Sequence, residues 1–396
     1  MKPQIWNKNF ILLTASNFLM FITYYAVLST LPLYLVSNFH VGKTIVGLIV
    51  SAYTIASVTV RPFSGFALDR FGRKAILYTT LILYAGFYLG YLVALSVAAL
   101  LLLRIVHGIT WGAVTISNTT QAIDIIPVER KGEGIGYFAL STTMAMSVGP
   151  IIGLFFFHQF GYTVMFITTF IIGLIGFTCV ILTHVPAYIP PKEKVKFNWH
   201  NLFDKGSVLP SVNLLIFMLS YGGLISFISL YGKEIGVHNT SLFFLVFALG
   251  IAISRFTSGK VFDKHGPRKI LSFCSLFLIA GFLVLALFKT VVGFYCASVI
   301  IGFGIGVVFP IFQAMVNNLA QPEHRGSANS TVYTALDLGM GMGMLLMGIV
   351  SQHTSISTSF MLCSAICLIG LIFFRSITVV RYEKKVSELA KPTENN

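Results

Sequence analysis

Long hydrophobic runs separated by short polar loops occupy most of the sequence. A helix that crosses a bilayer needs roughly 20 apolar residues, and twelve runs come close to or exceed that length. Because backbone groups in lipid must find their hydrogen bonds within the segment, such runs predict helices and not strands. The runs lie at approximately residues 9–36, 44–66, 75–95, 98–121, 133–157, 161–183, 209–231, 240–262, 270–289, 291–317, 327–350 and 356–379.

The longest polar stretch lies midway along the chain, at residues 184–208, and contains four lysines and three prolines. It separates six predicted spans from six. We therefore expect two six-helix bundles, at 1–183 and 209–380, joined by a cytoplasmic linker. The polar residues 381–396 predict a disordered cytoplasmic tail.

The 27 Lys and Arg residues are unevenly distributed among the predicted loops. If the chain starts in the cytoplasm, 21 of them fall in cytoplasmic loops and tails and three in the opposite loops. The remaining three, Arg61, Arg104 and Arg255, fall within spans. Because positive loops stay in the cytoplasm, both termini are predicted there. The compact loops are typical of a multi-pass protein of a bacterial inner (cell) membrane.

The composition agrees with a lipid environment and argues against nucleic-acid binding, metal binding and enzymatic activity. Only 10% of the residues are charged, against about 25% in soluble domains. The net charge of +14 comes from basic residues that lie mostly in the predicted cytoplasmic loops. We therefore expect the lipid bilayer as a partner and no nucleic acid. The five cysteines have no metal-ligand spacing, and no HExxH or GxSxG signature occurs. We expect no metal, no cofactor and no enzymatic activity.

The second half of the chain repeats the first at a shift of 194 residues. The shift superposes the charged loop after the second span on the loop after the eighth. Parallel repeats of this kind are typical of transporters, in which two bundles rock about a site near the midplane. Matched pairs include Arg61 with Arg255, Asp69 with Asp263, Gly108 with Gly302, Gly112 with Gly306 and Gly149 with Gly343.

The duplicated loop carries a motif. The first copy reads GFALDRFGRK (residues 65–74) and the second GKVFDKHGPRK (residues 259–269). Both resemble the G-x-x-x-D-R/K-x-G-R-K loop of the major facilitator superfamily, and span count, halves and linker extend the resemblance over the whole chain. The resemblance implies an all-α integral membrane fold with twelve transmembrane helices in two bundles related by pseudo-two-fold symmetry.

The loop motif implies a gate. Basic residues can hold the loop at the anionic inner leaflet or pair with the opposite bundle, and such a pair would break when the transporter changes state. A topology anchor is the simpler alternative. Pro267 replaces an arginine in the second copy, which should weaken that latch. The residues concerned are Gly65, Asp69, Arg70, Gly72, Arg73, Lys74, Asp263 and Lys264.

The fourth span contains LLLRIVHGITWGAV, which resembles the R-x-x-Q-G pattern of the same family. Arg104 and Gly108 match, and His107 replaces the glutamine. In the family the arginine is linked to proton transfer by tuning a nearby carboxylate. His107 is either a protonatable group or a hydrogen-bonding stand-in for the amide, and we favour the stand-in.

The fifth span contains Gly149-Pro150-x-x-Gly153, which resembles the G-P-x-x-G signature of the family's antiporters. Proline bends a helix, and glycines let a neighbouring helix pack tightly. The motif favours export, whereas an ordinary packing kink is the alternative.

Asp337 is the only acidic residue deep in a predicted span. A carboxylate at that depth costs several kcal/mol unless it is neutral or paired. We expect it to exchange a proton during transport or to pair with a cationic substrate; the alternative is a fixed ion pair with Arg61 or Arg255. These two arginines occupy equivalent places in the repeat and are predicted to tie the bundles together near the cytoplasmic side, or to snorkel.

The family resemblance implies that spans 1, 4, 7 and 10 line a central cavity, to which span 5 could add Thr142, Thr143 and Met146. Such a cavity would be amphipathic with little fixed charge, which suits a drug, a small metabolite or a sugar-like solute. The candidate lining residues are Asn17, Tyr24, Tyr25, Trp111, Thr115, Asn118, Asn213, Tyr221, Phe309, Gln313 and Asn317.

These features predict a monomeric secondary transporter that exports a small amphipathic molecule by alternating access, driven by a proton gradient. The alternative on the same fold is a uniporter or a proton symporter that imports a sugar or another small metabolite. A receptor without transport activity would not need the duplicated gating loop.

Overall fold

The structure is a computed structural model that describes residues 4–127, 130–184, 206–320 and 325–389, with the backbone alone at 62, 65–66, 69–71, 131–132, 256–265, 325–327 and 329. All the elements it describes are helical. They are α1 (Lys8–Phe39), α2 (Lys43–Phe71), α3 (Arg73–Val93), α4 (Val97–Ile125), α5 (Lys131–Ile181), α6 (Val208–Glu234), α7 (Ser241–His265), α8 (Pro267–Leu287), α9 (Val291–Leu319), α10 (Arg325–His353), α11 (Ile356–Phe373), η4 (Phe374–Thr378) and α12 (Val379–Leu389).

The longest helix, α5, contains two of the predicted spans. Its backbone breaks at Gly161, where φ is +81°, a conformation that glycine adopts readily because it has no Cβ. Of the described helices, ten are long and apolar enough to cross a membrane. Because α5 crosses twice and α7 adds the shorter apolar segment Ser241–Arg255, the fold has the twelve predicted spans.

Hydroxyl side chains start equivalent helices in the two halves. Ser96 accepts a hydrogen bond from the N–H of Ala99 at the start of α4, at 3.1 Å. Thr290, which lies 194 residues later, accepts one from Gly293 at the start of α9, also at 3.1 Å. Each cap satisfies an N–H that the helix itself leaves without a partner.

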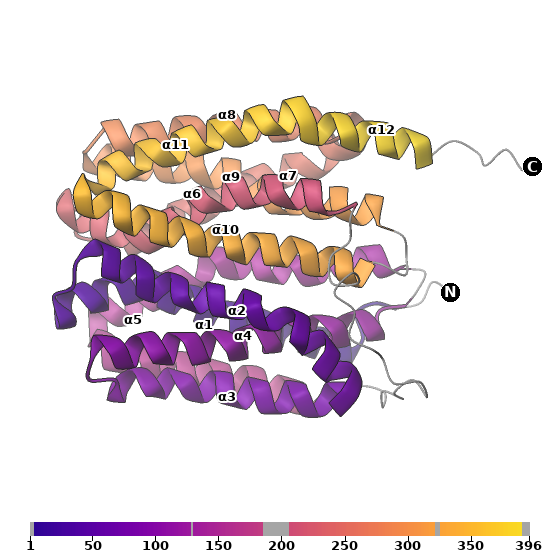
Figure 1. The fold of residues 1–396 in the computed structure, drawn as a ribbon, viewed down its shortest axis with the longest axis horizontal. Coiled ribbons are helices and arrows are strands. Elements are labelled where there is room, and N and C mark those ends of the chain that lie inside the picture. Colours follow the sequence, from indigo (N-terminus) through magenta and orange to yellow (C-terminus); the bar gives the residue numbers. More distant parts are fainter. Residues whose placement is uncertain (1–3, 128–129, 185–205, 321–324, 390–396) are drawn as a thin grey trace, which may run out of the picture.

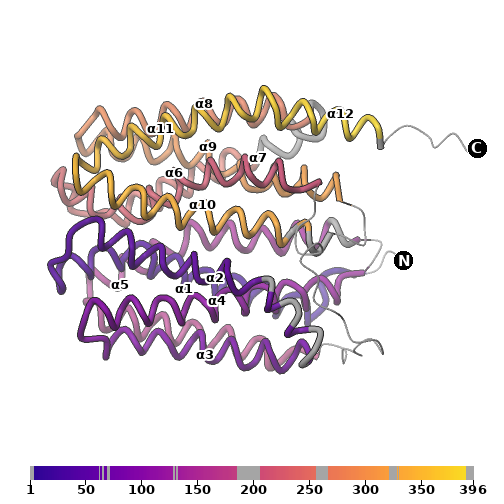
Figure 2. Tube along the Cα trace, in the orientation of Figure 1, coloured from indigo at the N-terminus to yellow at the C-terminus, as the bar shows by residue number. Residues whose placement is uncertain are grey.

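The helices form two groups that lie side by side, α1–α5 and α6–α12 (Figures 1 and 2). Within the groups, α1 packs on α5 and α6 on α10, whereas α2 packs on α10 across the boundary. Helix α1 begins and α12 ends at the same end of the molecule (Figure 1), which we call the terminal end. The loop between α1 and α2, which ends just before Lys43, lies at the opposite end (Figure 1).

The sequence repeat reappears as a repeat of helix contacts. A Cβ on Gly108 of α4 would lie 2.2 Å from the carbonyl oxygen of Tyr53. In the second half, a Cβ on Gly302 would lie 2.3 Å from the carbonyl oxygen of Phe247, and Phe247 is 194 residues after Tyr53. The α2–α4 and α7–α9 pairs therefore use the same glycine contact, which brings small residues to helix interfaces as membrane packing favours.

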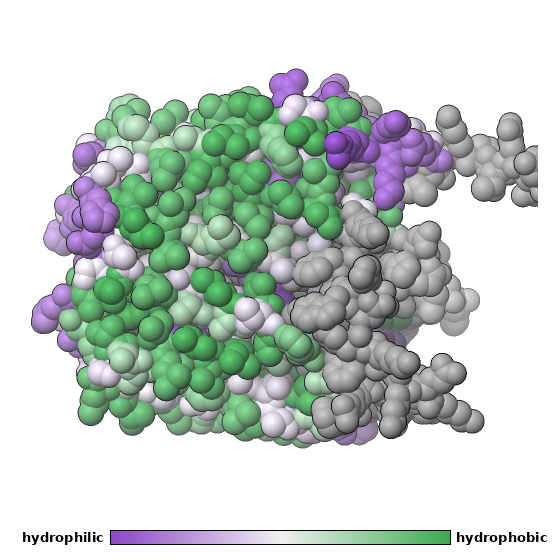
Figure 3. Space-filling view, in the orientation of Figure 1, coloured by the Kyte–Doolittle hydropathy of each residue, from purple (hydrophilic) through white to green (hydrophobic). Residues whose placement is uncertain are grey.

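The outer surface is apolar between the two ends. Figure 3 shows hydrophobic side chains over most of the face in view and hydrophilic ones gathered at the left end and around α12. Large apolar side chains such as Leu102 (63% exposed) and Phe155 (50% exposed) point outward. In water this surface would be unstable, whereas in a bilayer it is the expected contact with acyl chains.

The prediction that the chain is disordered after Arg381 is wrong for the residues up to 389. Helix α12 continues to Leu389, with Tyr382 buried. The Tyr382 hydroxyl lies 3.0 Å from the Asn318 amide of α9, and Glu383 pairs with Arg268 of α8 at 2.6 Å. The polar composition of this segment did not indicate these contacts, because a helix as short as α12 can be held in place by a few buried side chains. Residues 185–205 of the predicted linker lie outside the described residues.

Candidate functional site

Two oppositely charged side chains meet at the boundary between the helix groups. Arg61 of α2 lies with Nη2 2.5 Å from Oδ2 of Asp337 on α10, and Ser57 Oγ lies 3.2 Å from the same oxygen. The side chains of Arg61 and Asp337 are only 2% and 4% exposed. Both charges are thus withdrawn from water and lipid, and each offsets the other's desolvation cost.

From this ion pair to the opposite end, α2 and α10 are in close contact. A Cβ on Gly341 would lie 2.2 Å from Thr54 Oγ1, and one on Gly47 would lie 2.7 Å from the Met344 carbonyl oxygen. Such distances leave no room for a side chain. The Arg61–Asp337 ion pair and these glycine contacts therefore belong to one closely packed interface between the helix groups.

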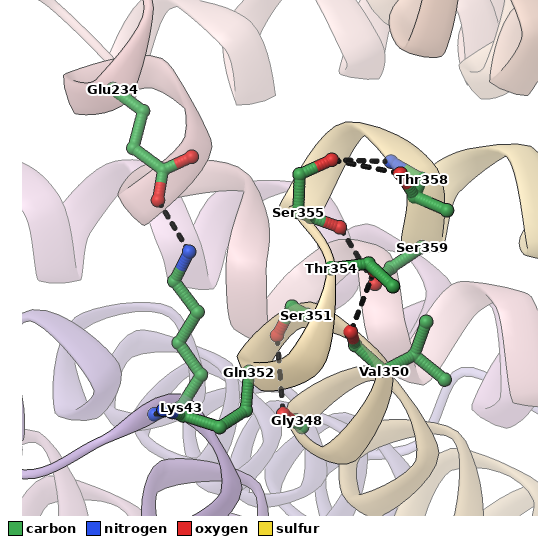
Figure 4. A network of polar contacts seen from close by, with 10 residues as sticks. All are labelled: Lys43, Glu234, Gly348, Val350, Ser351, Gln352, Thr354, Ser355, Thr358 and Ser359. Atoms are coloured by element: carbon green, nitrogen blue, oxygen red, sulfur yellow. Dashed lines mark hydrogen bonds and ion pairs between the residues drawn. The ribbon is translucent and has the colours of Figure 1, made fainter.

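Polar contacts close the opposite end (Figure 4). The backbone N–H of Lys43 donates to Gln352 Oε1 of α10 at 2.6 Å, and Lys43 Nζ pairs with Glu234 of α6 at 2.6 Å. At the equivalent place between α5 and α7, His158 Nε2 lies 3.4 Å from Thr240 Oγ1. These contacts connect the two groups at the opposite end.

Two adjoining open cavities, of about 400 and about 350 Å³, lie between α5 and α7. Leu140, Thr143 and Arg255 line both. Apart from these residues and Ser147, the larger cavity is lined by apolar residues, whereas amides of α9 contribute to the lining of the smaller one. The remaining lining residues are Met144, Ser147, Val148, Ala248, Ile251 and Ala252 in the larger cavity, and Ile135, Gly136, Ala139, Phe309, Pro310, Gln313, Ala314, Asn317 and Asn318 in the smaller.

Arg104 and His107 lie inside the N-terminal helices. Arg104 donates to the carbonyl oxygens of Ile49 and Val50 at 3.4 and 3.2 Å and to the Tyr91 hydroxyl at 3.2 Å. His107 Nδ1 lies 3.2 Å from the same hydroxyl. Neither side chain forms a hydrogen bond or an ion pair with a carboxylate of the described residues, so the arrangement ties α4 to α2 and α3.

Aromatic side chains gather around Arg104 and extend to the boundary of the groups. Arg104 lies over the Tyr53 ring at 4.1 Å, and Tyr24 stacks on Trp111 at 4.7 Å. Several buried polar atoms of this cluster have no hydrogen-bond partner among the described residues. They are the hydroxyls of Tyr24, Tyr25, Tyr53 and Tyr221, Trp111 Nε1 and His107 Nε2.

Other predicted cavity residues bond within one group of helices. Asn17 of α1 donates to Ser141 and Thr142 of α5, each at 2.9 Å. Asn213 of α6 donates to the carbonyl oxygen of Gly370 at 3.0 Å. Asn118 donates to Leu13 at 3.4 Å and Thr115 to Trp111 at 2.9 Å, again at backbone carbonyls. Of the predicted set, the structure places Thr143, Phe309, Gln313 and Asn317 on the cavity walls.

The gating loop is described in part. Gly72 (φ +93°) makes the turn between α2 and α3, Arg73 pairs with Asp124 of α4, and Lys74 lies over the Tyr78 ring at 5.4 Å. The pair of Arg73 with Asp124 lies within one helix group. The side-chain environments of Gly65, Asp69, Arg70, Asp263 and Lys264 lie outside the described residues.

The kink motif of α5 faces α1. A Cβ on Gly149 would lie 2.7 Å from Tyr25 Cβ, and one on Gly153 would lie 2.6 Å from the Ala26 carbonyl oxygen. Pro150 lies between them inside the helix. The two glycines therefore allow α5 to pack closely against α1 at Tyr25 and Ala26.

Sequence reasoning missed the polar residues that complete these sites. Ser57, Lys43 and Glu234 were not singled out, because a serine in a span and charges in short loops are ordinary features of a membrane protein. The signal for Ser57 was its spacing: it lies one helical turn before Arg61 and so shares its face.

Comparison with known proteins agrees with this architecture. The family profile of the Major Facilitator Superfamily matches residues 13–312 and, in a second match, 211–394. The chain belongs to the major facilitator superfamily. It is therefore a membrane transporter and not an enzyme, and the twelve-span fold is that of the superfamily.

Relatives within the superfamily include exporters. The staphylopine export protein of Staphylococcus aureus (strain Mu50) is 24% identical over 353 residues, which cover 83% of this chain and 86% of that protein. The quinolone resistance protein NorA of Staphylococcus aureus (strain MSSA476) is 24% identical over 355 residues, covering 86% and 89%.

Solved structures share the fold. A bacterial homologue of the human lysosomal transporter Spinster, in an inward-facing and occupied conformation, has a TM-score of 0.74 at 15% identity and covers 95% of this chain and 97% of that one. The nucleoside transporter NupG has a TM-score of 0.72 at 14% identity, covering 93% and 99%.

Proposed function

We propose that this chain exports a small amphipathic molecule in exchange for protons, by alternating access between its two helix groups. The observation that carries the proposal is the buried Arg61–Asp337 ion pair, which joins the two helix groups at the closely packed α2–α10 interface. Two superfamily relatives named for staphylopine export and quinolone resistance support export over import.

The distribution of Lys and Arg supports an orientation in which the terminal end faces the cytoplasm. The cavities between α5 and α7 then lie on the cytoplasmic side, and the contacts of Lys43 with Gln352 and Glu234 close the outer side. In this orientation the structure corresponds to a state that receives its substrate from the cytoplasm or the inner leaflet.

Protonation of Asp337 is the proposed coupling step. While the carboxylate is charged, its attraction to Arg61 holds α2 against α10, so an empty and unprotonated carrier stays closed to the outside. A proton taken up by the carboxylate removes that charge and weakens the tie. Proton exchange requires that the empty, unprotonated carrier does not reorient. A carrier that reoriented in that state would dissipate the proton gradient without transporting the substrate.

The test is proton movement in liposomes that contain the purified protein and a trapped pH dye. After an imposed pH gradient, compounds from a panel of amphipathic acids, amines and sugars are added one at a time. A substrate of an antiporter collapses the gradient, and Asp337→Asn abolishes this response. Glu133→Gln serves as control, because Glu133 pairs locally with Arg130 at the start of α5.

A different result would contradict the proposal in a defined way. Transport of a panel compound with no accompanying proton flux would indicate a uniporter. Proton flux in the same direction as the compound would indicate a symporter. Full proton-driven activity of Asp337→Asn would remove Asp337 from the coupling mechanism.

A further inference from the structure

Two contacts at the opposite end are equivalent by the sequence repeat but differ in chemistry. Subtracting 194 from the number of Gln352 gives His158. Gln352, near the end of α10, accepts the backbone N–H of Lys43 at the start of α2, at 2.6 Å. His158 Nε2, on α5, lies 3.4 Å from Oγ1 of Thr240, the residue before α7. Each contact joins one helix group to the other, but the imidazole changes its charge near neutral pH whereas the amide does not.

His158 can take up a proton from the water at that end. The residue is exposed and lies three positions before Gly161, where the backbone of α5 breaks. Its partner Thr240, in contrast, is only 1% exposed. A proton can therefore reach the imidazole while the two helix groups are still in contact.

Lys233 places a positive charge near His158 from the other helix group. A Cβ on Gly232 of α6 would lie 2.6 Å from the Cγ2 methyl group of Thr240, so Thr240 packs beside the residue that precedes Lys233. The ammonium group of Lys233 acts electrostatically on the imidazole. A proton on His158 would therefore add a repulsion between the two groups.

The elements around this contact do not offset that repulsion. In the described part of the chain, the helix turns at this end of α1, α3, α4, α7 and α9 contain no charged residue. The carboxylate of Glu234 pairs with Lys43 at 2.6 Å. His40 and His238, in the loops after α1 and α6, are exposed and become positive, not negative, over the same range of pH.

The hydrogen bond between His158 and Thr240 does not itself require one charge state. A threonine hydroxyl both donates and accepts, so it can bond to the neutral or to the protonated imidazole. The effect of pH on this contact therefore comes from the repulsion by Lys233. Pairs of exposed charges shift an equilibrium by about two- to fivefold.

We propose that His158 is a pH sensor that opens the outer side of the protein between α5 and α7. In an acidic exterior the protonated imidazole repels Lys233 and loosens the α5–α7 contact, whereas the contact of Gln352 with α2 keeps its strength. The inference rests on the proposed function in placing the opposite end outside the cell. It adds a second role for external protons, because acid then favours opening of the side from which the coupling proton enters.

The experiment measures the separation of the two groups at this end by electron paramagnetic resonance. Spin labels are attached at Ser37→Cys and Lys289→Cys, two exposed positions in different groups, in a protein whose five native cysteines are replaced by serine. The protein is held in phosphatidylcholine nanodiscs without a gradient or a substrate. Lowering the pH from about 7.5 to about 5.5 should raise the ratio of open to closed populations about two- to fivefold more in this protein than in its His158→Gln variant.

Further variants separate charge from shape. His158→Arg keeps a positive charge and should show the high ratio at both pH values. Lys233→Gln removes the repulsion and should reduce the response to that of His158→Gln. The matched control is His353→Gln, because His353 is an exposed histidine beside Gln352 at the other contact, and it should respond as the labelled protein does. Salt at about 1 M should reduce the response, because it screens exposed charges.

The proposal is wrong if His158→Gln or Lys233→Gln responds to pH as fully as the labelled protein, or if His158→Arg is closed at both pH values. It is also wrong if His158→Gln is open at both pH values, since the imidazole would then be a structural contact only.

A second background separates this proposal from the proposed coupling step. In Asp337→Asn no titration of Asp337 can contribute, and the comparison of His158 with His158→Gln should give the same factor. Failure of proton-driven export would therefore leave the pH sensor standing. Loss of the factor in both backgrounds would overturn the sensor and leave the export assay unaffected.

Discussion

The guanidinium of Arg61 lies 2.5 Å from the carboxylate of Asp337, although 276 residues separate them along the chain. One belongs to the second span of the first half and the other to the fifth span of the second half. The ion pair is therefore both a contact within the core of the molecule and a tie between the two parts that must move in transport. Its removal should change stability and transport in different ways.

Substitution of one partner should destabilise the protein, because the other charge stays buried without compensation. We expect Asp337→Asn and Arg61→Met each to lower the free energy of unfolding by about 3–5 kcal/mol. The double variant Arg61→Met/Asp337→Leu should recover most of this stability while proton-coupled transport stays absent. Thermal unfolding in detergent and the liposome assay provide the two measurements. Recovery of transport in the double variant would show that the ion pair is structural only.

A side chain at Gly47 should open the α2–α10 interface at the end opposite the termini. The Cβ of Gly47→Val would lie 2.7 Å from the Met344 carbonyl oxygen, so α2 and α10 must separate. We expect buried Thr54, replaced by cysteine, to react several-fold faster with an impermeant maleimide in this background, quantified by peptide mass spectrometry. Gly86→Val is the matched control, because nothing lies within 4 Å of a Cβ at Gly86. Equal labelling in both backgrounds of folded protein would contradict the assigned interface.

His107→Gln should retain transport and its pH dependence. The imidazole donates or accepts one hydrogen bond with Tyr91, and a glutamine amide has the groups to replace it. His107→Leu cannot form that bond and should lose about 1 kcal/mol of stability. Transport is measured between pH 5.5 and 8, roughly the range in which an ordinary histidine changes charge. A displaced pH profile in His107→Gln would instead assign His107 to proton transfer.

Helix α12 should contribute to stability through one aromatic side chain and not through its ion pair. Tyr382 is 7% exposed, and removing a large buried ring costs about 3–5 kcal/mol, so Tyr382→Ala should lower the unfolding midpoint clearly. Glu383→Gln breaks only an exposed pair with Arg268, which is worth about 0–1 kcal/mol. Equal midpoints for the two variants would show that α12 is not docked as described.

Much of the fold followed from the sequence because lipid restricts the possible structures. The break in α5 at Gly161 falls where one predicted span ends and the next begins. Candidate site residues were harder to place, since a polar side chain in a span can face a cavity or bond to a neighbouring helix. Asn17 and Asn213 were expected in the cavity but bond to adjacent helices. Helical periodicity does not distinguish these two environments.

The sequence by itself determined the membrane spans, the repeat and the presence of three arginines and one carboxylate at depth, because hydrocarbon excludes charge and demands long apolar helices. It left Arg61 and Arg255 equivalent, since the shift of 194 residues maps one onto the other. Only the packing of the two halves decided that Arg61 meets Asp337 while Arg255 faces a cavity beside Thr143. That choice depends on contacts between residues hundreds of positions apart, which no local pattern contains.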